Sequence, residues 1–97
     1  MVAAGNDDLV FTCPAGVTAL CKDIRVSAPV GNVTGLFVYI ASGAANVTVL
    51  GGTLSAGLEK GLMPWIALEP GDKLRIGVTG SSLAYFVSGS LLDGVAP

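Results

Sequence analysis

A chain of 97 residues has room for one domain, and its net charge of −2 with five scattered basic residues disfavours nucleic-acid binding. Hydrophobic residues make up 52% of the chain and charged residues 12%, about half the usual charged share. The longest charge-free stretch, 26–58, is interrupted by proline, glycine and asparagine, which excludes a membrane-spanning helix there. Few charges with many apolar residues are typical of an obligate protein interface, so we expect burial between subunits.

Residues 1–8 are predicted to form a flexible N-terminal arm, because the segment is polar and shows no apolar period. It has neither the basic region nor the apolar run of a secretory signal, so we expect synthesis in a cytoplasm. Apolar residues then alternate at Leu9, Phe11 and Cys13. This pattern predicts a half-buried strand, which ends at a turn over 14–16.

The segment 17–28 is the longest predicted strand, with Leu20, Ile24 and Val26 on one face. Lys22 interrupts that apolar face, which indicates an edge or a β-bulge that turns the ammonium group outward. After a loop over 29–34, the segment 35–40 is expected to be a strand with apolar residues on both faces, so that both faces are covered. A short strand over 46–50, with Val47 and Val49 inward, is expected to complete a hairpin.

The segment 51–61 is glycine-rich and is interpreted as a connection. The next strand, 62–68, contains Pro64, which favours an edge or a strand start, and Trp65 is expected to anchor it in the core. A Pro-Gly turn over 69–72 is predicted to join this strand in a hairpin to an alternating strand that contains Leu74, Ile76 and Val78. The last predicted strand begins at 83, and 91–97 is expected to be a C-terminal tail.

Seven or eight short strands, with turns every 8 to 12 residues or so, predict an all-β chain. No amphipathic helical pattern competes with this interpretation. We therefore expect a small antiparallel β-sandwich, jelly-roll-like or Ig-like, over residues 9–90, between the arm 1–8 and the tail 91–97.

Catalytic chemistry is disfavoured by the residue inventory. The chain has no histidine, which excludes Ser-His-Asp and Cys-His catalysis and the usual zinc sites. Most of the seven carboxylates fall in turns or near the termini. Cys13 and Cys21 are separated by a turn and about five strand residues, which places them too far apart for a disulfide. We therefore expect no enzyme, no catalytic residue, no metal, no cofactor and two reduced cysteines.

Two segments carry a resemblance to a known family. These are FTCPAGVTALCKDIRVSAPVGNVTGLFVYI (11–40) and ALEPGDKLRIGVTGSSLAYFVSG (67–89). They resemble small β-sandwich virion proteins of tailed bacteriophages, which serve as capsid decoration, head-tail or minor tail components. The resemblance implies a structural protein that is made in the host bacterial cytoplasm and resides in the virion. It implies as partners copies of the chain itself, as a homo-oligomer, and other virion proteins such as major capsid or tail proteins.

On this hypothesis, the assembly contacts lie in the arm, the strand edge at 63–66 and the tail. A carbohydrate-binding or host-adhesin module is the alternative function, and an exposed Trp65 with Tyr39 nearby would favour it. The candidate assembly contacts are Asp7, Asp8, Met63, Trp65, Ile66, Leu91 and Leu92.

Overall fold

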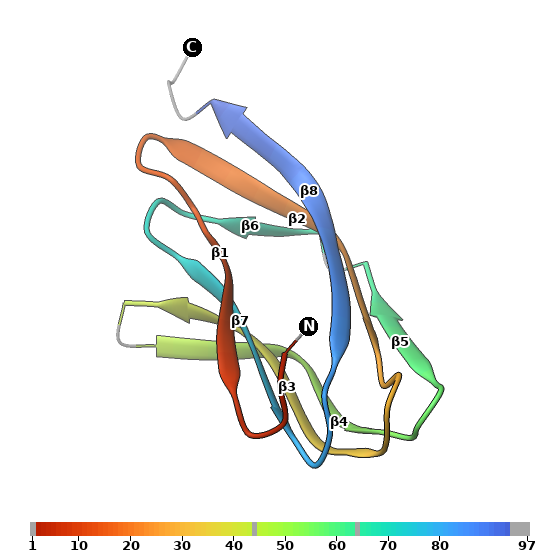
Figure 1. Ribbon diagram of the computed structural model, residues 1–97. Helices are drawn as coiled ribbons and strands as arrows, with labels where there is room; N and C mark the ends of the chain where they lie inside the picture. The colour runs from red at the N-terminus through yellow and green to blue at the C-terminus, as the bar shows by residue number, and fades with distance from the viewer. Residues whose placement is uncertain (1, 44, 64, 94–97) are drawn as a thin grey trace.

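The computed structural model describes residues 2–43, 45–63 and 65–93, and within them the chain forms strands and turns (Figure 1). No helix of this part of the chain is long and apolar enough to cross a membrane. The strands in chain order are β1 (Asp7–Thr12), β2 (Val17–Ser27), β3 (Val33–Ser42), β4 (Ala45–Leu54), β5 (Glu59–Leu62), β6 (Ile66–Leu68), β7 (Lys73–Thr79) and β8 (Ala84–Asp93).

The strands form two antiparallel four-stranded sheets, which confirms the predicted all-β sandwich. One sheet has the order β1-β7-β3-β4. In the other, β2 is central: β8 pairs with one of its edges along most of its length, and the shorter β5 and β6 share the opposite edge. Four strand edges of the two sheets are therefore left without a neighbour among the described residues.

The core lies between the sheets. The prediction that both faces of the segment 35–40 are covered is wrong, because Phe37 on the outer face is 53% exposed. Leu36, Val38 and Ile76 are fully buried, and their neighbours in β3 and β7 point to the outer face. From the opposite sheet, Ile24 and Val26 pack against them. No polar or charged side chain of the described residues is buried, so apolar packing holds the two sheets together.

Of the two alternatives predicted at Lys22, an edge or a β-bulge, the structure shows the bulge. The pairing of β2 with β8 shifts between Cys21 and Asp23, so Lys22 is the extra residue. The shift also corrects the predicted faces of β2, because an extra residue inverts the alternation. Ala19 and Cys21, rather than Leu20, are therefore buried on the same face as Ile24.

A second irregularity corrects the predicted face of β1. The register with β7 shifts between Leu9 and Phe11, so Leu9 lies on the outer face and is exposed. Val10 and Phe11 instead pack partly against the core. Asp8 lies opposite the buried Ile76 and therefore shares its inner face, at the rim of the sandwich.

The Pro-Gly turn forms as predicted, but the hairpin does not. The Asp72 amide donates to the Glu69 carbonyl over 3.0 Å, and Gly71 has a φ of 89°, the left-handed value that a type II turn needs at this position. The twist of a type II turn does not match that of paired strands. The chain accordingly passes from β6 in one sheet to β7 in the other.

Several element boundaries differ from the sequence-based ones. The segment 51–61, predicted as a connection, contributes the end of β4 and the start of β5. β8 continues through 91–93, where a tail was predicted. Val2, in the predicted arm, is fully buried and forms a bridge to Leu83. Val47 shares the inner face with Ile40, but it is exposed because the β3–β4 hairpin is not covered there.

Candidate functional site

An exposed patch, which we call the Trp65 patch, consists of Lys22, Met63 and Trp65. Trp65 was expected in the core, but it is 62% exposed, and Met63 is 67% exposed. The ammonium nitrogen of Lys22 lies 5.6 Å from the centroid of the indole ring, within cation–π range. The bulge in β2 accounts for this contact, because it turns Lys22 away from the core. The patch thus joins the connection between β5 and β6 to the middle of β2.

The backbone of Trp65 is unusual. Its φ is 49°, the only positive value among the described residues other than glycine. This left-handed conformation costs a bulky residue about 1 to 2 kcal/mol. Strained, exposed residues of this kind often occur at functional sites, and the inference runs from the strain to the function. Trp65 is therefore the strongest single candidate for a functional side chain.

The outer face of the β2 sheet continues this surface. Arg25 lies between Phe86 of β8 and Gly61 of β5, and Phe86 is 58% exposed. A shallow depression of about 450 Å³ reaches from Arg25 to Met63 and connects the two areas. Tryptophan, methionine, phenylalanine and arginine are the residues enriched at protein interfaces. This face, from Phe86 to Trp65, therefore combines residue types enriched at protein interfaces with the charged Asp23, Glu59 and Lys60, which also line the depression.

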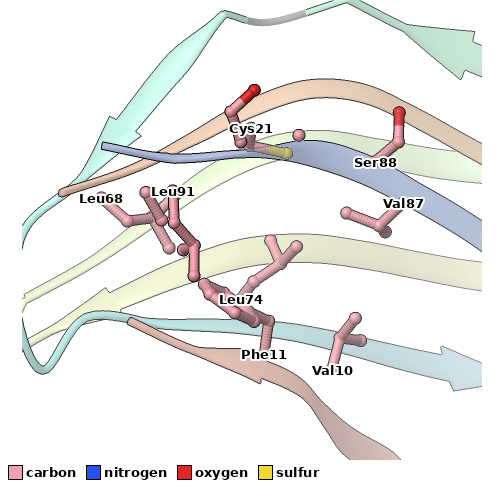
Figure 2. A pocket seen from close by; sticks show the side chains of 11 residues that line it. Val10, Phe11, Cys21, Leu68, Leu74, Val87, Ser88 and Leu91 are labelled. Atoms are coloured by element: carbon pink, nitrogen blue, oxygen red, sulfur yellow. The ribbon is translucent and has the colours of Figure 1, made fainter. Parts of the chain in front are cut away.

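A cavity of about 260 Å³ opens between the two sheets on the side of β1 and β8 (Figure 2). Leu91 of β8 points across it toward Leu74 of β7, and Phe11 lies beneath. Leu91 is 57% exposed although it shares a face with the buried Ala19. The cavity is lined by Val10, Phe11, Ala19, Cys21, Leu68, Leu74, Val87, Ser88, Gly89, Ser90 and Leu91.

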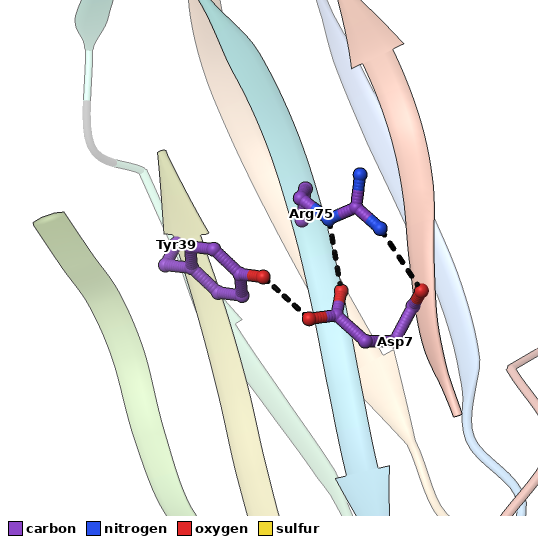
Figure 3. Close-up of polar contacts among 3 residues, drawn as sticks. All are labelled: Asp7, Tyr39 and Arg75. Atoms are coloured by element: carbon purple, nitrogen blue, oxygen red, sulfur yellow. Dashed lines mark hydrogen bonds and ion pairs between the residues drawn. The ribbon is translucent and has the colours of Figure 1, made fainter. Parts of the chain in front are cut away.

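A polar cluster lies on the outer face of the other sheet (Figure 3). Arg75 donates from Nε to a carboxylate oxygen of Asp7 over 3.1 Å and from a terminal nitrogen to the Asp7 carbonyl over 3.2 Å. Tyr39 donates its hydroxyl to the same carboxylate, and this hydrogen bond raises the pKa of Tyr39. The cluster ties β1 to β7 and β3. Because the three groups satisfy one another at the surface, we interpret the cluster as structural.

Both cysteines are buried free thiols, as their spacing predicts. The thiol of Cys13 donates to the Leu68 carbonyl over 3.3 Å. Burial, and to a smaller extent the charge of Asp23, raises the pKa of Cys21. A thiol with a raised pKa is a poor nucleophile at neutral pH, which suits a packing role.

The seven predicted contact residues do not form one surface. Met63 and Trp65 lie together, whereas Ile66 is half-buried and packs against the core. Asp7 and Asp8 belong to opposite faces of β1 in the other sheet. Leu91 lines the cavity, and the side chain of Leu92 lies outside the described part of the structure, as does Pro64. No group of three or more potential metal-ligating side chains occurs among the described residues.

The chain matches no protein-family model, no curated protein and no solved structure in the comparisons made with each. The function must therefore be argued from the surfaces themselves. Sequence reasoning missed Phe86 and Arg25 as contact candidates. Tyr85-Phe86 was the available signal, because two adjacent aromatic residues in a strand point to opposite faces, so one of them points away from the core.

Proposed function

We propose that this chain is a non-enzymatic structural protein of a tailed bacteriophage virion, a capsid decoration protein that self-associates and stabilises the shell. A neck or minor tail component is the other position in the virion that suits the same surfaces. The observation that carries the proposal is the exposed face from Phe86 to Trp65. The resemblance of the segments 11–40 and 67–89 to small phage virion proteins is the reason for proposing a virion as the assembly.

The physical mechanism is the burial of apolar surface against a neighbouring subunit. Burial contributes about 25 cal/mol per Å² before the cost of association is subtracted. Large, stiff side chains such as Trp65 and Phe86 contribute most, because they bury much area and lose little conformational entropy. The low charge of the chain, 12% of its residues, reduces the desolvation cost of such contacts.

The test is incorporation into particles. The chain with Trp65→Ala is supplied to the virus that encodes it, and purified particles are assayed for the chain. We expect wild-type chain in the particles and at least a tenfold loss with Trp65→Ala. Phe37→Ala is the matched control, because Phe37 is also an exposed aromatic residue, 53% accessible, but lies in the other sheet. Absence of the wild-type chain from purified particles would refute the proposal.

Carbohydrate binding is the second candidate, and the exposed ring of Trp65 is the observation that favours it. Tyr39, the predicted second ring, belongs to the other sheet and donates its hydroxyl to Asp7, so the two rings do not form one platform. Trp65 is the only tryptophan, so its fluorescence reports directly on ligand binding. A saturable change on titration with oligosaccharides, lost in a Met63→Ala variant, would favour this function over assembly.

A further inference from the structure

The free edge of β8 is the feature that carries a further inference. β8 has ten residues, and among the described residues it pairs with β2 alone, on one side. Figure 1 shows β8 running along β2, the strand with which it pairs. From 84 to 92 it contains no charged residue and no proline. Edge strands of monomeric proteins are normally protected by charges, proline, bulges or short length, because their unpaired amide and carbonyl groups attract other strands.

The other three edges have such protection. β1 has six residues, carries Asp7 and Asp8, and is interrupted by a register shift. β5 and β6 have four and three residues. β4 is long and uncharged, but its pairing is irregular at two points, and Gly52 has a φ of 112°, which distorts the strand. The shift in the β2–β8 pairing comes from the extra residue Lys22 in β2 and leaves the alternation of β8 itself regular. Among the described strands, β8 is thus the edge best suited to pair with another chain.

Apolar side chains are exposed on both faces of β8. Phe86, on the outer face, and Leu91, on the inner face, are each more than half accessible. Tyr85 also lies on the inner face, opposite Val26, and is exposed. A strand added to this edge would cover these side chains on both faces and close the mouth of the cavity between the sheets.

We propose that β8 pairs antiparallel with β8 of a second copy, which joins the two β2 sheets into one continuous eight-stranded sheet. This inference deepens the proposed function by naming the surface through which the chain self-associates. A second copy fits because the segment 84–92 carries no charge, so that it can pair with itself about a twofold axis through its middle residue, Ser88, without charge repulsion. A twofold axis at Ser88 pairs all nine residues and leaves Asp93 beyond them, so no like charges meet.

The register follows from the alternation of β8. With the axis at Ser88, Tyr85 lies opposite Leu91 of the second copy, and both are on the inner face. Phe86 lies opposite Ser90 of the second copy on the outer face. Aromatic–aliphatic pairs of this kind stabilise strand pairing. This pairing places Tyr85 of the second copy beside Leu91 at the mouth of the cavity between the sheets.

The test compares single lysine substitutions at two edges. Ser88→Lys brings two ammonium groups together at the twofold axis of the proposed dimer. Within one subunit the substituted residue lies opposite Asp23 in β2, so the substitution is compatible with folding. Thr48→Lys is the matched control, on the exposed β4 edge. Sedimentation velocity is measured over a range of concentrations, with circular dichroism to verify folding. We expect at least a tenfold weaker dimer with Ser88→Lys and wild-type association with Thr48→Lys.

A second variant tests the register without adding charge. In Ser88→Cys, mild oxidation is expected to link two chains, because the new thiols face each other and the native thiols are buried. The β8 pairing would be overturned if the Ser88→Lys variant associated as strongly as wild type, or if Thr48→Lys weakened association equally. Failure of the Ser88→Cys variant to form a cross-link would also overturn it. A wild-type chain that stays monomeric would also overturn it. Incorporation into particles decides the proposed function separately, through Trp65.

Discussion

Gly89→Ala is expected to destabilise the fold strongly for so small a change. Gly89 lies opposite Cys21, next to the bulge at Lys22. A methyl group there would lie 3.0 Å from the carbonyl carbon of Leu20 and 3.2 Å from Cα of Cys21, with the Leu20 carbonyl oxygen closer still. All three atoms belong to the backbone, so no side-chain rotation relieves the clash. Overpacking of this kind costs about 1 to 3 kcal/mol.

Gly61→Ala is the matched control. Gly61 is also a strand residue next to β2, but an added methyl group there has its nearest neighbours at 3.7 and 3.9 Å, which is ordinary contact. Alanine is then neutral or stabilises by about 0.4 to 1 kcal/mol, because the unfolded chain loses freedom.

The assay for both variants is urea unfolding followed by circular dichroism. We expect the free energy of unfolding of Gly89→Ala to lie about 2 to 3 kcal/mol below that of Gly61→Ala, or about 10 °C or more in Tm. Equal stability of the two variants would show that the bulge does not force the close approach described here.

Three further predictions concern the core and two titrating groups. Leu36→Ala, at a fully buried site, is expected to lower the free energy of unfolding by about 3 kcal/mol, whereas Leu91→Ala in the isolated chain is expected to lower it by less than about 1 kcal/mol. The midpoints of urea unfolding of the two variants test this difference. Because the pKa of Cys21 is raised, alkylation of its thiol at about pH 8.5 is expected to be slow in the folded chain and fast in urea, and equal rates would contradict this. The free energy of unfolding is expected to fall as the pH rises further, since the thiol ionises at a lower pH in the unfolded chain than in the folded one. Asp7→Asn is expected to lower the pKa of Tyr39, because it replaces the carboxylate that accepts the hydroxyl hydrogen bond; an unchanged NMR titration would contradict the contact.

The all-β class and most of the strands could be predicted from the sequence because alternation in strands is local. Leu74, Ile76 and Val78 were placed on one apolar face from their period alone, and each is buried. Pairing partners depend on the whole chain, so the turn at Pro70 and Gly71 was recognised while its path between sheets was not. In the same way, a bulge inverts the alternation of inward and outward side chains for every residue beyond it. Without the pairing of the strands, the sequence does not show whether the residues before the bulge or those after it point to the core.

The candidate surface was only partly predictable. Met63 and Trp65 were selected because they lie near a proline that favours an edge, but Trp65 was expected in the core, where aromatic residues in strands usually pack. Its exposed side chain goes together with a left-handed backbone conformation, which the sequence does not specify. Phe86 and Arg25 lie opposite each other only because β8 pairs with β2 in this register.

The most direct test of the central claim, that the chain is a subunit of an assembly, is its mass in solution. Light scattering is measured over a wide concentration range, with circular dichroism to verify β structure. We predict a β-rich species that grows from the 9.7 kDa monomer to a dimer or larger closed oligomer as concentration rises. A folded chain that remains at 9.7 kDa throughout would contradict self-association.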